Sequence, residues 1–480
     1  MRRSIFLLAL LAGACGGAAD HGPADVSLIG DAPALIDPSQ RVLSPASAVL
    51  LSTVAQGLVR FDAAGQIEPG LAIRWDVSDD GLYYTFRLKD DPEIDAEDAA
   101  HILNAAIGPT SRNPLKPVLG AIEEIVAVTP DVIEIRLRAP RPNFLQLLAQ
   151  PELAIIGKAG GTGPMRIAKR SDATLIFDAI HDDDDGTGDD EADDHAAHEV
   201  RLRTERAALA VARFADGGTD AVIGGRFTDL PVARAAALPP RDLRLDPVAG
   251  LFGLAIVETD GFLGSAEGRR ALSMAIDRAL LGRIFGVAWA GQSSLLPGGL
   301  PDLQRPTRPD WADTALVQRR SIAKEAVDRW VREQGAPPLL RVALPEGPGA
   351  RLLLTLLRRE WGAIGVPVIA VPLAADADLR LIDEVAPADI ASWYLRRFTC
   401  DRSRVCSEEA DALLVAAREA PSLAERSARL ADADVRFAEI TPFIPLAAPL
   451  RWSLVSARLP MWKENARGVH PLEYLRGEAP

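Results

Sequence analysis

Hydrophobic and polar positions alternate along this chain in two periods, one typical of strands and one typical of helices. The runs Leu339–Leu344 and Pro367–Pro372 are short and largely apolar, as in buried strands. Between them, Ala350–Ile364 separates its leucines from its arginines at helical spacing, and Gly365 follows as a helix C-cap. This stretch therefore predicts a strand–helix–strand unit, which is typical of an α/β fold.

Other segments show the same two periods. Val200–Arg203 and Leu251–Val257 have the composition of strands, and Glu123–Arg138 predicts a hairpin with its turn at Pro130–Asp131. Arg269–Phe285 places its apolar side chains on one face, which predicts one continuous amphipathic helix. The chain therefore mixes short strands with helices along most of its length.

Three further helices are marked by residues that cap their first turn. A Ser or Asp side chain can accept a hydrogen bond from the unpaired N–H groups there, and carboxylates in the first turn favour the helix dipole. The predicted helices are Asp95–Ile107 with Asp95 as the cap, Glu408–Glu419 after Ser407, and Leu423–Glu439 after Ser422, with Glu425 completing a capping box.

Length and composition predict a large globular protein. The chain has 480 residues, of which 48% are hydrophobic and 25% charged, so it can bury an extensive core. The formal net charge is -14, but nine carboxylates lie within Asp182–Asp194, and the rest of the chain carries only -5. Such a mildly acidic chain excludes nucleic acid as an expected partner.

The first residues have the pattern of an export signal. Arg2 and Arg3 precede the apolar run Ile5–Ala12, which is too short to span a bilayer, and small residues lead to Cys15. The pattern is similar to a lipobox, in which the cysteine is acylated, although Ala12 stands where leucine is commoner. We therefore expect a signal peptide over residues 1–14, a lipid on Cys15 and a flexible tether over residues 15–24.

Export implies an oxidising compartment, where disulfides persist. Besides Cys15, the chain has two cysteines, Cys400 and Cys406, close together in sequence. We expect these two to form a disulfide.

An acidic run, His181–Glu199, is the most unusual local feature. If Gly188 is taken as the turn of a calcium loop, oxygen-bearing side chains occupy the ligand positions. Position 12 carries Asp where a bidentate Glu is usual, so a solvated insertion and a His/Asp metal trap stay open as alternatives. The metal ligands of this hypothesis, with calcium as the cation, are Asp183, Asp185, Asp189 and Asp194.

Sequence motifs give no support to an enzyme. The chain contains no G-x-S-x-G, H-E-x-x-H or Walker A pattern. Of its six histidines, one lies in the tether and three lie in or beside the acidic run, which leaves His101 and His470 for a catalytic triad. We expect neither catalysis nor a cofactor.

The stretch Gln56–Leu88, QGLVRFDAAGQIEPGLAIRWDVSDDGLYYTFRL, resembles the peptide, dipeptide and nickel family of extracellular solute-binding proteins of ABC importers. The resemblance continues with Gly161–Met165 (GTGPM), Arg269–Asp277 and Phe443–Leu446, and covers most of residues 25–475. The positions that match in the first stretch are Gly57, Leu58, Gly65, Pro69, Leu71, Ala72, Trp75, Ser78, Asp80, Gly81, Tyr84, Phe86 and Leu88.

This resemblance implies an α/β fold of the type II periplasmic-binding-protein class, with two ligand lobes and an inserted third domain. It also implies a monomeric, lipid-anchored receptor that delivers a small peptide-like ligand to a membrane permease. The implied location is the periplasmic face of the cell envelope or the outer surface of the cytoplasmic membrane. The alternative is a receptor-fold lipoprotein whose pocket is degenerate or repurposed for sensing, partner binding or a metal chelate. The implied divisions are residues 25–44, 160–247 and 448–480 for lobe I, 45–159 for inserted domain II, and 248–447 for lobe III.

The resemblance also suggests where a ligand would bind. The family's amino-group anchor falls within Leu381–Leu395, where Asp383, Glu384 and Asp389 are candidates and none stands in the full motif. Asp389 has the spacing closest to the family's pattern. The expected ligand-binding residues are Asp389 and Trp393 on one wall and Asp31, Ala32, Pro33 and Ala34 on the other.

Overall fold

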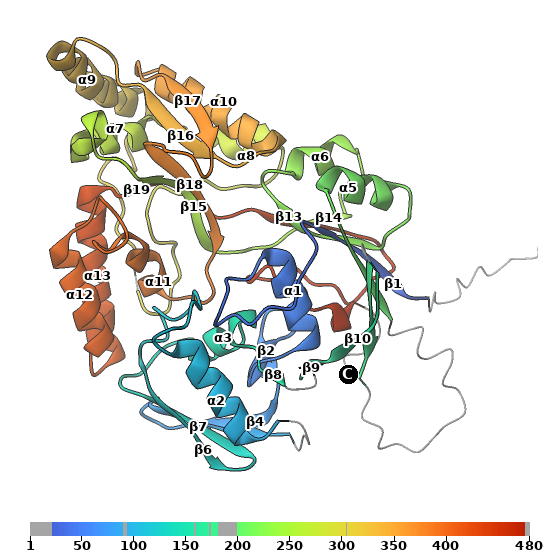
Figure 1. The fold of residues 1–480 in the computed structure, drawn as a ribbon. Coiled ribbons are helices and arrows are strands. Elements are labelled where there is room, and N and C mark those ends of the chain that lie inside the picture. Colours follow the sequence, from blue (N-terminus) through green and yellow to red (C-terminus); the bar gives the residue numbers. More distant parts are fainter. Residues whose placement is uncertain are drawn as a thin grey trace, which may run out of the picture.

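The computed structural model describes residues 22–89, 94–157, 160–171, 174–180, 199–303 and 305–475. Its strands form three large sheets of seven, five and four strands, together with two small two-stranded pairs. Figure 1 shows the five-stranded sheet at the top, the seven-stranded sheet at the right and the four-stranded sheet at the bottom. Each sheet has helices packed against it, so the molecule is of the α/β class.

The seven-stranded sheet gathers segments that are far apart in the sequence. Its central strand, β1, pairs in parallel with β12 and β13, whereas the outer strands pair antiparallel. Helices α1 (Pro45–Val54), α5 (Ala207–Ala215) and α6 (Leu230–Ala235) are associated with it. In sheet order, the strands are β10 (Met165–Arg170), β11 (Thr174–Ala179), β12 (Val200–Glu205), β1 (Ala24–Ile29), β13 (Ala221–Arg226), β20 (Arg451–Val455) and β14 (Leu243–Leu245).

The five-stranded sheet contains the predicted strand–helix–strand unit. Strands β16 and β17 are parallel and are connected by α10 (Pro348–Gly362), which confirms that prediction. The helix ends before Gly365, whose φ of 86° is favourable for glycine. In sheet order, the strands are β17 (Val368–Pro372), β16 (Leu340–Leu344), β18 (Leu379–Val385), β15 (Gly250–Ile256) and β19 (Phe443–Ala447).

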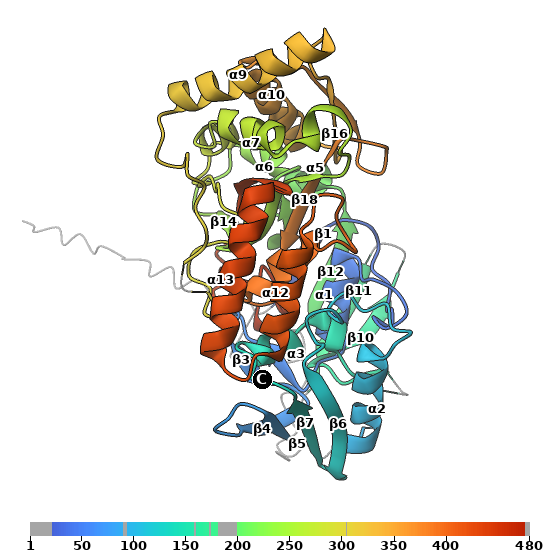
Figure 2. The ribbon, with the colours of Figure 1, turned by 90° about the vertical axis from the view of Figure 1, so that its left-hand side faces the viewer.

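Helices cover both faces of this sheet. Neighbouring residues of one strand point to opposite faces and so pack against different helices. Leu251 packs with α11, α12 and α13, whereas Phe252 packs with α7, α8, α9 and α10. Figure 2 shows α12 and α13 side by side, running from this sheet toward the four-stranded sheet. The helices are α7 (Ala266–Ala275), α8 (Leu280–Phe285), α9 (Leu316–Gln334), α11 (Ala391–Leu395), α12 (Glu408–Glu419) and α13 (Leu423–Ile440).

The prediction of one continuous helix over Arg269–Phe285 is wrong. Helix α7 ends at Ala275, and the chain is extended at Ile276 before α8 begins at Leu280. The break is stabilised from outside the helix: the N–H of Asp277 donates to the buried Glu360 carboxylate at 2.6 Å. The buried Arg278 guanidinium also donates to the Ser273 and Pro445 carbonyls. The hydrogen bonds to Glu360 and Pro445 are long-range, and together with the local one to Ser273 they stabilise the break.

The four-stranded sheet is built from two hairpins. The turn at Asp80–Gly81 joins β4 to β5, and the predicted turn at Pro130–Asp131 joins β6 to β7. Helix α2 (Ala96–Ile107) packs against the sheet, and its cap Asp95 accepts from the Asp98 N–H as predicted. The strands are β4 (Ala72–Val77), β5 (Tyr83–Leu88), β7 (Val132–Leu137) and β6 (Ile122–Thr129).

Glycines allow the chain to cross between the four-stranded and seven-stranded sheets. A Cβ on Gly161 would lie 1.4 Å from the Val54 carbonyl oxygen at the end of α1, and one on Gly163 would lie 2.4 Å from the Val54 carbonyl carbon. Glycine is therefore required at both positions. The nearby short elements are β2 (Val59–Phe61), β3 (Ile67–Pro69), α3 (Phe144–Leu148), β8 (Ile156–Gly157) and β9 (Gly160–Gly161).

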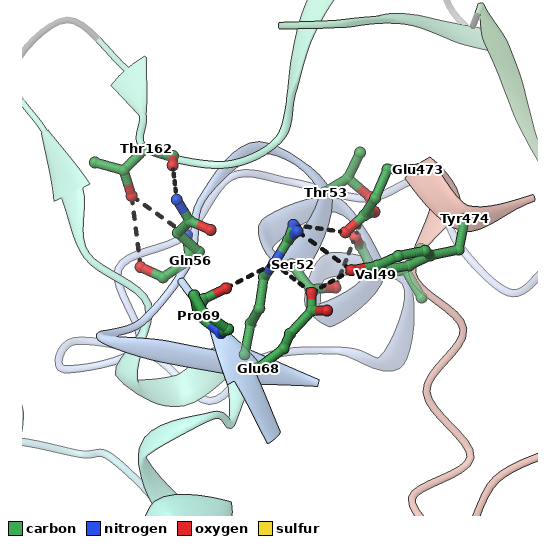
Figure 3. A network of polar contacts seen from close by, with 10 residues as sticks. Val49, Ser52, Thr53, Gln56, Glu68, Pro69, Thr162, Glu473 and Tyr474 are labelled. Atoms are coloured by element: carbon green, nitrogen blue, oxygen red, sulfur yellow. Dashed lines mark hydrogen bonds and ion pairs between the residues drawn. The ribbon is translucent and has the colours of Figure 1, made fainter. Parts of the chain in front are cut away.

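The segment after β20 contacts all three parts of the molecule. His470 Nε2 lies 3.0 Å from the Asp246 carboxylate beside the seven-stranded sheet. Arg467 pairs with Asp389 beyond β18. Glu473, in the 3-10 turn Leu472–Tyr474, accepts from Arg60 of β2 at 3.0 Å. Figure 3 shows Tyr474 reaching Glu68 of β3, with Glu473 beside it. This segment therefore links the sheets by polar contacts.

Candidate ligand-binding cavity

A cavity of about 890 Å³ lies where the end of β13 meets the five-stranded sheet. We call it the interlobe cavity, because its walls come from both sheets. The seven-stranded sheet contributes Arg226, Phe227 and Thr228, whereas β15, β18 and the loops around them contribute the rest. Its other lining residues are Ala255, Ile256, Val257, Pro345, Glu346, Leu373, Arg380, Leu381, Ile382, Asp383, Glu384, Arg397, Phe398, Arg402, Ser403 and Arg404.

The position of Arg226 follows from close packing at the end of β13. A Cβ on Gly225 would lie 2.3 Å from the Trp452 indole, so glycine lets β20 approach β13 at this point. The Trp452 indole N–H then donates to the Arg226 carbonyl at 2.8 Å. The backbone of Arg226 is thereby fixed, and its side chain extends toward the five-stranded sheet.

Two guanidinium groups from the opposite sheet form ion pairs with Asp383 of β18. Its carboxylate lies 2.8 Å from Arg451 Nη1 and 3.2 Å from Arg226 Nε. Both arginines also donate to the Asp383 carbonyl. Burial lowers the pKa of Arg451, and the Asp383 carboxylate opposes that change. This group of three charges, which we call the Asp383 cluster, connects the two sheets at the back of the cavity.

The neighbouring carboxylate, Glu384, is also paired. Arg397 Nη2 donates to Glu384 Oε1 at 2.6 Å. Arg397 belongs to the 3-10 turn Arg396–Phe398, whose Phe398 is fully buried and lines the cavity. The pair therefore places a neutralised carboxylate and an arginine beside an apolar ring.

The loop from Cys400 to Cys406, which we call the disulfide loop, forms another part of the wall. The structure joins the two sulfurs in a disulfide, with the Cα atoms 5.0 Å apart. The loop is further fixed by the Cys400 N–H, which donates to the Asp411 carboxylate of α12, and by the Ser403 hydroxyl, which donates to the Val405 carbonyl. Arg402, Ser403 and Arg404 thereby reach the cavity.

The ligand-binding residues predicted from the sequence lie elsewhere. Ala32 and Pro33 line a separate cavity of about 70 Å³ beside β10, β11 and β12. Asp31 is exposed, and the Ala34 N–H donates to Ser47 Oγ at 3.1 Å. The interlobe cavity does not include these four residues, and their role in binding stays a prediction.

Asp389 and Trp393 also lie outside the lining of the interlobe cavity. Arg467 Nη2 lies 2.6 Å from both Asp389 carboxylate oxygens, and Gln146 of α3 approaches the same carboxylate at 3.4 Å. Trp393 packs between the core of the four-stranded sheet and the core around α12 and α13, with its ring 4.8 Å from that of Tyr394. In this structure both side chains make contacts within the protein.

Of the three carboxylates considered as an amino-group anchor, Asp383 and Glu384 are the ones that reach the cavity. The arginines around them were not predicted from the sequence. A signal was available for two of these, because Arg402 and Arg404 stand between the cysteines expected to pair. For Arg226 and Arg380 no local pattern could have revealed the role, since it depends on how two distant sheets meet.

Other predicted sites fall on residues outside those described. These are the lipidation site Cys15 and the acidic run with Asp183, Asp185, Asp189 and Asp194. Across the described ranges, no three His, Cys, Asp or Glu side chains gather in a way that could hold a metal ion. No helix in that part of the chain has the length and apolar character needed to cross a membrane.

This arrangement of two α/β lobes, an inserted third domain and a cavity between the lobes defines a type II periplasmic-binding-protein fold. The chain belongs to the bacterial extracellular solute-binding proteins, family 5, whose middle-region model matches residues 66–395. The family and the fold are those of binding proteins.

Three known proteins illustrate the similarity. The nickel-binding periplasmic protein of Escherichia coli (strain K12) is 29% identical over 158 residues, which is 32% of this chain and 29% of that protein. Di/tripeptide-binding protein 1 of Pseudomonas aeruginosa (strain UCBPP-PA14) is 23% identical over 388 residues, covering 70% of this chain and 68% of that protein. The structure of the Escherichia coli murein tripeptide binding protein superposes with a TM-score of 0.78 at 18% identity, covering 95% and 98% of the two chains.

Proposed function

We propose that this chain is the substrate-binding lipoprotein of an ABC importer, which captures a peptide-like solute between its lobes and delivers it to a membrane permease. The observation that carries the proposal is the interlobe cavity of about 890 Å³, lined by residues from two different sheets. A volume of this order suits a small ligand. A ligand held between two lobes stabilises their closed arrangement, and a permease can recognise that arrangement.

Family membership supports the same proposal. The relatives include one named for nickel and one named for dipeptides and tripeptides. A metal would need ligands, and the described residues show no cluster that could supply them. A peptide-like solute is therefore the better match to a cavity with both apolar and charged walls.

Thermal-shift measurements on the full chain, purified in detergent, test this function. A solute that binds the folded protein raises the free energy of unfolding by about 2.7 kcal/mol at one hundred times its dissociation constant. We expect dipeptides or tripeptides to raise the melting temperature, whereas Ni²⁺ alone does not. If no peptide gives a shift, the cavity has been repurposed and the proposal fails.

A cavity-filling variant locates the site. Ala255 lies on β15 and lines the cavity, so Ala255→Trp places an indole in the ligand's space and should remove the peptide-induced shift. Val317 on α9 is 83% exposed, and Val317→Trp serves as the matched control that keeps the shift. A shift that survives in Ala255→Trp would place the binding site elsewhere.

A further inference from the structure

The charges that line the interlobe cavity are unequal in number. Five arginines face three carboxylates, which leaves a net charge of two positive units. A sixth arginine, Arg451, lies behind Asp383 in the Asp383 cluster. Outside the lining, Asp401 lies 3.6 Å from Arg402, but its side chain is 73% exposed, and Glu258 lies near Arg404. These two carboxylates balance the two units of excess in the lining, and with Arg451 counted the group carries one positive unit.

Two carboxylates of the cavity, the buried Asp383 and the half-exposed Glu384, already have cationic partners. Asp383 is 9% exposed and pairs with two guanidinium groups, whereas Glu384 pairs with Arg397. At Asp383, an ammonium group of a ligand would have to displace the largely buried Arg451 and leave it unpaired, which is costly. The third carboxylate, Glu346, is exposed, so solvent screens its charge. The cavity therefore offers little to a cation.

Two lining arginines, Arg380 and Arg404, by contrast have no close ion pair with the described carboxylates. Arg380 donates to the carbonyls of Leu373 and Ala375, which hold the guanidinium in place and do not neutralise it. Arg404 forms no ion pair within 4.0 Å with any carboxylate that the structure describes, and Glu258 acts on it only from a longer distance. A guanidinium presents a planar array of donors that matches carboxylate and phosphate oxygens.

Apart from Thr228 and Ser403, the remaining lining is apolar, with Phe227, Ile256, Leu381 and Phe398 among its members. Low-polarity walls strengthen the attraction between an arginine and an anion inside the cavity. We propose that the interlobe cavity selects solutes of net negative charge, bearing carboxylate or phosphate groups, over neutral and cationic solutes of the same size. This inference rests on the proposed function and names the class of solute that the same site takes.

Calorimetric titration of the full chain with five tripeptides tests the inference. The peptides share alanine at both ends and have glutamate, phosphoserine, glutamine, serine or lysine in the middle. We expect the glutamyl or phosphoseryl peptide to bind at least about tenfold more tightly than the neutral and lysyl ones. This factor corresponds to the lower end of the free energy that a hydrogen bond to a charged group contributes. A preference for one of the two acidic peptides identifies carboxylate or phosphate as the recognised group.

The double variant Arg402→Gln/Arg404→Gln locates the charge effect, because both residues are exposed and the substitution should leave the fold intact. We expect this variant to lose most of the preference for acidic peptides. The matched control is Arg241→Gln/Arg332→Gln, which removes the same charge from exposed positions outside the cavity and should keep the preference. High salt should weaken the acidic peptide more than the neutral one.

The outcomes separate two kinds of failure. If all five peptides bind with equal affinity, peptide capture stands and the inference about charge is overturned. The same holds if the preference is identical in the cavity variant and in the control. If no tripeptide binds to the unmodified chain, the proposed function fails, and the charge inference fails with it.

Discussion

At the scale of single residues, the partner of a carboxylate within the protein determines whether that carboxylate can bind the amino group of a ligand. Asp389 has the spacing expected of an amino-group anchor, but Arg467 lies 2.6 Å from both of its oxygens. The Arg467 side chain is 5% exposed, so a ligand that displaced it would leave a buried cation unpaired. The sequence could not reveal this, because the two residues are 78 positions apart and meet through the segment after β20.

Glu473 provides a prediction about pH. Burial raises the pKa of this carboxyl from its ordinary value of 4.5 to about 7, although Arg60 at 3.0 Å opposes the change. Because the folded-state pKa is the higher one, the unfolded chain releases this proton first as the pH rises. The contribution of Glu473 to stability is therefore complete below about pH 4.5 and is lost as the pH approaches 7, by about 3 kcal/mol in total.

The variant Glu473→Gln keeps a hydrogen-bonding oxygen for Arg60 and cannot ionise. We expect its free energy of unfolding to fall less between pH 4.5 and 7 than that of the unmodified chain, as measured by denaturant titration at several pH values. Glu464→Gln is the control, because that side chain is 43% exposed and lies 3.8 Å from Arg244. Parallel pH profiles for the unmodified chain and Glu473→Gln would contradict the prediction.

At the scale of elements, local signals predicted well those features that depend on local physics. Ser407 and Ser422 cap α12 and α13 as expected, since a cap is a contact within one turn of helix. The hairpin turn at Pro130–Asp131 was identified for the same reason. The break between α7 and α8 was missed, because Glu360, which stabilises it, lies 83 residues away from Asp277.

The disulfide loop is the element whose role can be measured directly. Peptide mapping under non-reducing conditions should find Cys400 and Cys406 linked. Replacing both with serine should lower stability by less than the ~3 kcal/mol expected for a 15-residue loop, because the closed loop is shorter. The same double substitution should weaken the binding of acidic peptides, because Arg402 and Arg404 then lose their fixed positions. This loss of affinity should be easier to detect than the loss of stability. Free thiols after aerobic purification, or unchanged affinity in the double serine variant, would contradict these expectations.

At the scale of the whole molecule, the sequence predicted the class of fold and not the contents of its cavity. The motif around Asp80 and Gly81, together with the strand and helix patterns, led to the correct family and fold. The interlobe cavity forms where β13, β18 and the disulfide loop meet. In the sequence, β13 lies more than a hundred residues before the other two segments. Ion pairs such as that of Arg226 with Asp383 arise from this meeting and have no local signature.

Anchoring is also a property of the whole molecule. The proposed lipid on Cys15 would hold the receptor near its permease, so that captured solute is released beside the transporter. Cys15→Ser should release the chain from membrane fractions, while purified protein of both forms should bind peptides equally. Fractionation followed by mass analysis of the N-terminal peptide checks this. A serine variant that still sediments with membranes would rule out Cys15 as the anchor.

The position of Arg402 and Arg404 inside a seven-residue disulfide loop has a consequence for redox chemistry. Solute binding and reduction of the disulfide are thermodynamically linked. If the oxidised loop binds a solute ten times more tightly than the reduced loop, bound solute lowers the equilibrium constant for reduction tenfold. For a two-electron couple, this factor corresponds to about 30 mV in reduction potential. Solute in the cavity would thus protect the bond, and a thiol reductant would open the loops of empty receptors before those of loaded ones.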